Sequence, residues 1–165
     1  MKSCPKDHFS FSMSSGAANV VEPQICLKNK LVLGMTLNNV GSGINIVVIN
    51  GKTGEVVKTG NFNMYNGDVE ELIDFLLSIE QGSAVLMASF DDPATKLNHE
   101  ARELIGALGS SASRSLAFRD NWVFVGGKGI KTSFEKHLKY NKLNDKYDGW
   151  PAMIELEGCI PKYQD

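Results

Sequence analysis

The adjacent carboxylates Asp91 and Asp92 are the most informative polar residues of the sequence. They follow an apolar run at 84–90 that is typical of a buried strand, a position where functional loops are commonly placed on a rigid scaffold. Asp92 precedes Pro93, and an aspartate before a proline is also a good cap for a turn or a helix. Capping is the favoured interpretation for Asp92, and the role of Asp91 stays open.

A second polar group, Arg119 and Asp120, precedes an aromatic strand that contains Trp122. Arginine offers a fork of hydrogen-bond donors, a carboxylate accepts from hydroxyls, and an indole offers a flat apolar face. Asp91, Arg119 and Trp122 together could therefore hold a sugar or another polyhydroxylated ligand. The charges at 119–120 could instead form a solvated bend or an internal ion pair, and composition alone does not separate these alternatives.

Catalytic chemistry has little support in the sequence. The three histidines, His8, His99 and His137, are scattered, and none stands at metal-ligand spacing from a cysteine or another histidine. We expect His99 and His137 to be exposed on polar helices. The glycine clusters lack the spacing of nucleotide-binding loops, and no Gly-x-Ser-x-Gly elbow is present. An enzyme using Asp91 and Asp92 would rest on adjacent carboxylates alone, so we expect no catalytic residue, no metal, no cofactor and no enzymatic activity.

The bulk composition indicates one globular domain over residues 1–165, with residues 1–3 as a linker or added segment. Lysine and arginine number 17 against 19 acidic residues, which gives a formal net charge of -2. This balance argues against a nucleic-acid partner and against electrostatic attachment to anionic membranes. The apolar runs are of strand length, so we expect no membrane insertion.

Three cysteines are present, and two of them, Cys4 and Cys159, lie near opposite ends of the sequence. A bond between them would close a long loop and could contribute roughly 5 kcal/mol to stability. They could equally be unrelated buried thiols, because cysteine is a common core residue. If the two are bonded, the odd count leaves one thiol over.

The apolar patterning predicts an α+β fold whose sheet is at least partly antiparallel. The first thirty residues read as irregular. A hairpin is expected where the turn chemistry of 50–54 joins two strands. Strands are predicted at 31–37, 44–49, 55–58, 84–90, 121–125 and 152–156; helices are predicted between Asp68 and Gly82, at 98–108, and as a short polar helix at 132–138.

Six blocks of sequence are spread over the whole chain: residues 15–21, 39–45, 50–54, 90–98, 118–124 and 149–161. Together they resemble the "family with sequence similarity three", cytokine-like secreted proteins that include the interleukin-like EMT inducer and pancreatic-derived factor. The resemblance implies a secreted, extracellular signalling protein that acts on cells through a surface receptor, without catalytic machinery. It also implies a single compact domain of two β-sheets with short flanking helices around a polar, water-filled cavity.

The same resemblance assigns the cysteines. It implies a disulfide that joins the chain ends through Cys4 and Cys159. The cysteine that matches Cys26 pairs in the family with a residue upstream of Cys4 that this sequence does not contain, so we expect a shortened form in which Cys26 is unpaired. The interleukin-like EMT inducer supports covalent dimers through a cysteine where this chain has Val125. We therefore expect a monomer or a non-covalent dimer.

The sequence is also similar to the sugar-binding stem region of the protein O-mannose N-acetylglucosaminyltransferase. The resemblance places its ligand-contacting aspartate and arginine at Asp91 and Arg119, and a further arginine at Ser42. One ligand contact is therefore absent. The alternative function is a lectin-like carbohydrate-binding module with Asp91, Arg119, Trp122 and Ser42 as ligand-binding residues and glycans as partners.

Overall fold

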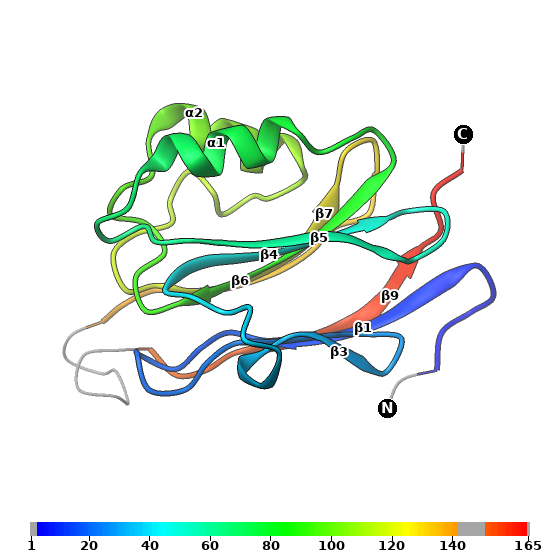
Figure 1. Ribbon diagram of the computed structural model, residues 1–165, viewed down its shortest axis with the longest axis horizontal. Coiled ribbons are helices and arrows are strands. Elements are labelled where there is room, and N and C mark those ends of the chain that lie inside the picture. The colour runs from blue at the N-terminus through cyan, green and yellow to red at the C-terminus, as the bar shows by residue number, and fades with distance from the viewer. Residues whose placement is uncertain (1–2, 142–150, 165) are drawn as a thin grey trace.

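The computed structural model describes residues 3–141 and 151–164. These residues form three layers (Figure 1): two helices cover one face of a five-stranded sheet, and a four-stranded sheet covers the other. Every strand pair in both sheets is antiparallel. The expected α+β class, the single domain and the two sheets with short flanking helices are confirmed. The expected polar cavity stays a prediction.

The five-stranded sheet lies at the centre of the molecule, in the strand order β5-β4-β6-β7-β8. Its three inner strands are buried along almost their whole length, because helices cover one face and the second sheet covers the other. Such strands read as continuous apolar runs, which is why the sequence predicted them well. The strands are β4 (Gly43–Asn50), β5 (Val56–Phe62), β6 (Ser83–Phe90), β7 (Asn121–Gly127) and β8 (Phe134–Leu138).

The four-stranded sheet has the order β3-β2-β1-β9. Along β1, Phe9, Phe11 and Met13 point into the core, and the serines between them lie on the other face. The expectation that the first thirty residues are irregular was therefore wrong, and the last strand begins three residues later than predicted. The strands are β1 (His8–Ser14), β2 (Gln24–Leu27), β3 (Lys30–Leu33) and β9 (Glu155–Pro161). The strand predicted at 31–37 was too long, because its last three residues form a 3-10 turn, η1 (Met35–Leu37).

The two helices, α1 (Val69–Leu77) and α2 (His99–Ala107), begin next to the predicted starts at Asp68 and Asn98. Asp68 accepts a hydrogen bond from the Glu70 amide at 2.9 Å, and Asn98 accepts one from the Ala101 amide at 2.9 Å. Each cap satisfies an amide that the first turn leaves without a helical partner. The apolar face of α1, which includes Leu72, packs into the core between the helices and the central sheet.

The short polar helix predicted at 132–138 is wrong, because these residues form the edge strand β8, paired with β7. The Phe134 ring lies edge-on to Phe11 at 5.2 Å and covers one side of the gap between the sheets. The Glu135 carboxylate accepts a hydrogen bond from the Trp122 indole at 2.7 Å. Local helix propensity is a weak preference, and these long-range contacts override it.

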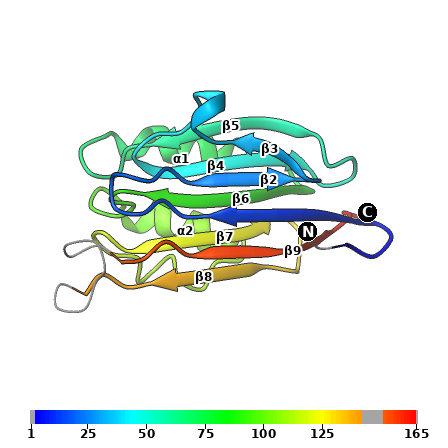
Figure 2. The same cartoon turned by 90° about the horizontal axis from the view of Figure 1, so that it is seen from below.

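The disulfide between Cys4 and Cys159 is present, with 5.7 Å between the two Cα atoms, so the expected pairing is confirmed. It joins the segment before β1 to β9, and Figure 2 shows both termini at the same end of the molecule. The closed loop spans a sequence separation of 155 residues, so the bond contributes roughly 5 kcal/mol in the chain-entropy model. Cys26 is free and half-buried.

Two of the segments singled out in the sequence lie partly outside the described residues. Residues 1–2 of the expected 1–3 segment lie outside the described residues, as do residues 149–150 of the sixth sequence block. Neither described helix has the length and apolar character needed to cross a membrane.

Candidate functional site

One end of the central sheet brings together three of the predicted ligand-binding residues. Gly43 of β4 pairs with Phe90 of β6, so Ser42 and Asp91 are the next residues beyond this pair at the same sheet end. Strand β7 is antiparallel to β6 and begins at this end, two residues after Arg119. The structure thus places Ser42, Asp91 and Arg119 at one corner of the sheet, although they are far apart in the sequence.

Both charged residues at this corner have left-handed backbone conformations. Asp91 and Arg119 each have φ 63°, a region that costs a residue with a side chain roughly 1 kcal/mol or more. The conformation is held by the surroundings: the Asp91 amide donates to the Ala18 carbonyl at 3.1 Å, and the Arg119 amide donates to Asp92 Oδ1 at 3.4 Å. Strain of this kind is commonly retained where side-chain direction matters for function.

Asp92 is the structural member of the carboxylate pair. Its side chain is buried and accepts hydrogen bonds from the Ala94 amide at 3.0 Å and from the Thr95 hydroxyl. The capping interpretation of Asp92 is therefore confirmed for a turn. Asp91 is half-buried, and its pKa is raised by burial and by the nearby Asp92 charge, while the Arg119 charge opposes the rise.

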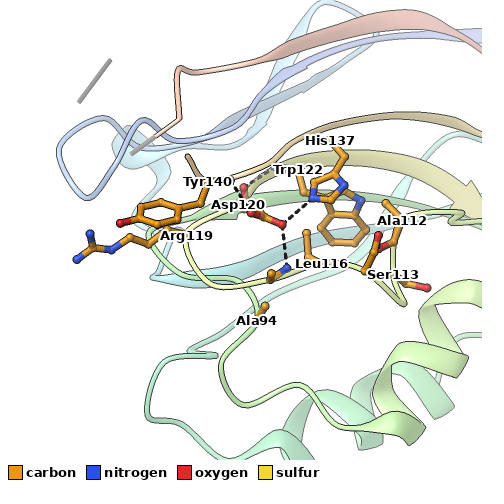
Figure 3. Close-up of polar contacts among 12 residues, drawn as sticks. Ala94, Ala112, Ser113, Leu116, Arg119, Asp120, Trp122, His137 and Tyr140 are labelled. Atoms are coloured by element: carbon orange, nitrogen blue, oxygen red, sulfur yellow. Dashed lines mark hydrogen bonds and ion pairs between the residues drawn. The ribbon is translucent and has the colours of Figure 1, made fainter. Parts of the chain in front are cut away.

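The Arg119 guanidinium lies beside two aromatic rings that contact each other. Its central carbon lies 4.9 Å from the centre of the Phe118 ring and 5.7 Å from that of Tyr140, within the range of cation–π contacts. The two rings meet edge to face at 6.0 Å, and Phe118 is 41% exposed. Figure 3 shows Arg119 beside Tyr140, directed away from the buried side chains around Trp122. We call Asp91, Phe118, Arg119 and Tyr140 the Arg119 corner.

Hydrogen bonds of Asp120 with its neighbours, including His137, support the Arg119 corner. The Asp120 carboxylate accepts from the Ala117 amide at 2.9 Å and from the Tyr140 amide at 2.7 Å, and its Oδ2 lies 2.7 Å from His137 Nε2 (Figure 3). These bonds fix both segments that carry the aromatic rings. The expected exposure of His137 is wrong, because only 13% of its side chain is accessible, whereas His99 is exposed.

Trp122 does not contribute a flat face to the corner. It is fully buried, stacks parallel to Phe124 at 5.8 Å, and donates its indole proton to Glu135, so both faces lie inside the core. The expectation that its ring contacts a ligand is therefore corrected. Phe118 and Tyr140 supply the aromatic surface instead. Phe118 adjoins Arg119 in the sequence and could have been found there, but Tyr140 reaches the corner only through the pairing of β8 with β7.

Glu135 is a second structural carboxylate that sequence reasoning missed. It accepts hydrogen bonds from the Ser110 hydroxyl, the Ser111 amide and hydroxyl, the Ala112 amide and the Trp122 indole. Burial alone would raise the pKa of Glu135, but the bonds from Ser110, Trp122 and Ser111 outweigh burial and hold its pKa below the ordinary value. The ionised carboxylate therefore ties β8 to the segment after α2 and to the core.

The geometry of the Arg119 corner suits binding. A guanidinium in contact with two aromatic rings, with a carboxylate nearby, can hold a partner through directional hydrogen bonds and apolar contact. Within 3–141 and 151–164, no three side chains of histidine, cysteine, aspartate or glutamate gather in a group that could hold a metal ion.

The sequence is similar to known proteins over almost its whole length. Residues 42–130 match the family model described as interleukin-like EMT inducer. The chain is similar to Protein FAM3C of Danio rerio, with 58% identity over 99% of this chain and 73% of the relative. Protein FAM3C of Homo sapiens is 57% identical over the same shares, and Protein FAM3A of Homo sapiens is 48% identical over 96% of this chain and 70% of the relative.

The matched segment begins at Ser42 and includes Asp91 and Arg119, so it contains the charged part of the corner described above. More than half of the chain matches the family model, and the identity to the relatives extends over almost all of it. The chain therefore belongs to the cytokine-like FAM3 family and contains the domain described as interleukin-like EMT inducer.

Proposed function

We propose that this chain is a secreted, cytokine-like signalling protein that acts on cells by binding a surface receptor and catalyses no reaction. Family membership supports the signalling role, and the Cys4–Cys159 disulfide supports an oxidising, extracellular location. The receptor contact is assigned to the Arg119 corner.

The contact of Arg119 with both Phe118 and Tyr140 is the observation that supports this assignment. Arginine, tyrosine and tryptophan are the residues that most often dominate the energy of protein interfaces. A guanidinium that already contacts two rings loses little freedom on binding, so it is suited to anchor a partner. The exposed part of Phe118 offers apolar surface next to the charge.

The test is saturation binding of fluorescently labelled protein to responsive cells, with Arg119→Gln compared to wild type. Loss of an anchoring arginine that contributes about 2 kcal/mol weakens binding about thirtyfold. Arg114→Gln is the matched control, because Arg114 is an exposed arginine on another surface, 2.8 Å from Glu103. Unsaturable wild-type binding, or equal weakening by the two substitutions, would contradict the proposal.

A second candidate function is carbohydrate binding at the same corner. The juxtaposition of Asp91 and Arg119 favours it, because a carboxylate accepts hydrogen bonds from sugar hydroxyls and a guanidinium donates to sugar oxygens. The rings of Phe118 and Tyr140 provide apolar faces. Ser42 lies at the same sheet end but offers only a short hydroxyl, so the affinity is expected to be weak.

Carbohydrate binding is tested by a glycan array followed by titration of the best sugar with NMR detection. Shifts that saturate at Asp91 and Arg119 and disappear in Asp91→Asn support a lectin-like site. A titration with no shift at these two residues rules the lectin-like site out and leaves receptor binding by protein contact.

We further propose that the protein is a monomer or a non-covalent dimer. Val125 carries no thiol and is buried in β7, so this position cannot form an intermolecular disulfide. Sedimentation equilibrium with and without reductant tests this proposal. A dimer that reductant dissociates would contradict it.

A further inference from the structure

A polar hollow of about 450 Å³ lies at the opposite end of the central sheet from the Arg119 corner. It is bounded by the β4–β5 turn, by the segment that follows α1, and by the C-terminal segment after β9. Its polar lining residues include Lys52, Lys58, Ser78, Glu80, Gln81 and Tyr163.

The Lys58 ammonium is held in a defined position at the wall of this hollow. It lies 4.6 Å over the centre of the Phe75 ring and donates a hydrogen bond to the Ser78 hydroxyl. The Ser78 hydroxyl in turn donates to the Phe75 carbonyl at 2.6 Å, so its oxygen is left to accept from Lys58. Lysine side chains are otherwise flexible, and this chain of contacts orders the charge before any ligand arrives.

The charge of Lys58 is not balanced by a neighbouring carboxylate. Across the described parts of the chain, its contacts are the hydroxyl and the ring, and no aspartate or glutamate lies at ion-pair distance from its Nζ. Lys58 is half-buried, and its contact with Ser78 is exposed, so the ammonium remains accessible from the hollow. Lys52 adds a second positive charge to the lining and Glu80 one negative charge, so the three charges sum to +1.

The opposite wall is built by close contacts that only glycine permits. A side chain on Gly82 would overlap the Tyr163 ring, and one on Gly51 would overlap the Gly82 carbonyl. The Tyr163 amide donates to the Gly51 carbonyl at 2.7 Å, which fixes the C-terminal segment against the β4–β5 turn. The Tyr163 hydroxyl lies 3.5 Å from the Gln81 amide nitrogen, so both polar groups stand together at the hollow.

We propose that this hollow binds an oxyanion, a sulfate, phosphate or carboxylate group, with Lys58 as its charged contact and Ser78, Gln81 and Tyr163 as neutral partners. An ammonium held by a hydroxyl and an aromatic face keeps further N–H donors for an anionic oxygen. The amide and phenol beside it can donate to the remaining oxygens. The oxyanion belongs either to a free inorganic ion or to a sulfated sugar, which share this chemistry.

The experiment is an NMR titration of the isotope-labelled protein with three probes: sodium sulfate, a sulfated disaccharide, and the same disaccharide without sulfate. Saturable shifts at Lys58, Gln81 and Tyr163 are expected with both sulfated probes and not with the unsulfated one. Loss of one charge-assisted hydrogen bond in Lys58→Gln should weaken binding by about 10- to 100-fold. Lys131→Gln, at an exposed lysine outside the hollow, should bind as wild type does.

The relative affinities identify the source of the anion. Tighter binding of the sulfated disaccharide assigns the hollow to sulfated sugars, and equal binding of inorganic sulfate assigns it to small ions. Gln81→Ala provides a second, exposed substitution if Lys58→Gln is unstable, and it should weaken binding less. Absence of saturable shifts, or equal affinities for wild type and Lys58→Gln, would overturn the proposal without affecting the Arg119 corner.

Discussion

Replacement of Glu135 by glutamine tests whether this carboxylate holds β8 to the core. Its Oε2 accepts from the Trp122 indole and its Oε1 accepts from the amides of Ser111 and Ala112. Glutamine has one accepting oxygen and places an NH₂ group where the other oxygen was. In either orientation at least one N–H loses its acceptor and meets another donor.

The expected loss of stability follows from the hydrogen bonds that glutamine cannot accept. An N–H donor left without an acceptor costs about 1–3 kcal/mol, so we expect Glu135→Gln to lower the free energy of unfolding by about 2 kcal/mol at pH 7. For a domain of this size, each kcal/mol shifts Tm by about 2–4 °C, which gives a decrease of about 4–8 °C. Glu80→Gln, at an exposed glutamate, should shift Tm by less than about 1 °C.

The assay is urea unfolding under oxidising conditions, followed by tryptophan fluorescence at several pH values. Because the pKa of Glu135 is lowered in the folded protein, its carboxylate stabilises the fold above the ordinary value of 4.5. That contribution is lost as the pH falls through the folded pKa, so the difference between wild type and Glu135→Gln should shrink there. Equal stabilities of Glu135→Gln and Glu80→Gln at pH 7 would refute the reasoning.

Three further predictions follow from the same contacts. Asp91→Asn should raise stability by less than about 1 kcal/mol at pH 7 while it weakens partner binding, because the raised pKa of Asp91 means that its charge is disfavoured in the folded state. This gain should disappear in urea unfolding below pH 3.8, where the unfolded carboxyl is also protonated. Cys4→Ser should lower the free energy of unfolding by about 2–5 kcal/mol in the same assay, and an unchanged midpoint would show that the disulfide is dispensable. Asn45→Leu should lower the free energy of unfolding, measured by calorimetry, by about 2–4 kcal/mol. The reason is that the buried Asn45 amide hydrogen-bonds both the N–H and the carbonyl of Gly41, at 2.9 and 2.8 Å. A loss below about 1 kcal/mol would contradict this account.

Elements with a strong local signal were predictable from the sequence. The apolar runs of β4, β6 and β7, the hairpin turn at 50–54, and the caps Asp68 and Asn98 all specify their structure within a few neighbouring residues. Strand β1 also carries such a signal, since apolar and serine residues alternate from His8 to Ser14, but the turn-forming residues after it obscured the pattern.

The candidate site needed the tertiary structure. Neighbouring strand residues face opposite sides of a sheet, so the sequence shows that Trp122 and Val123 point apart. It does not show that both sides of β7 are covered, which removes Trp122 from the surface. Strand β8 and the pairing of His137 with Asp120 likewise depend on strand register.

The sequence by itself determined the strongest strands and the starts of both helices, because those depend on local periodicity and side-chain chemistry. Tertiary structure alone decided that Asp91, Arg119 and Tyr140 share one corner and that Lys58 lines a hollow at the other end. The physical reason is that strand pairing joins distant segments through backbone hydrogen bonds, whose register is set by packing on both faces of the central sheet.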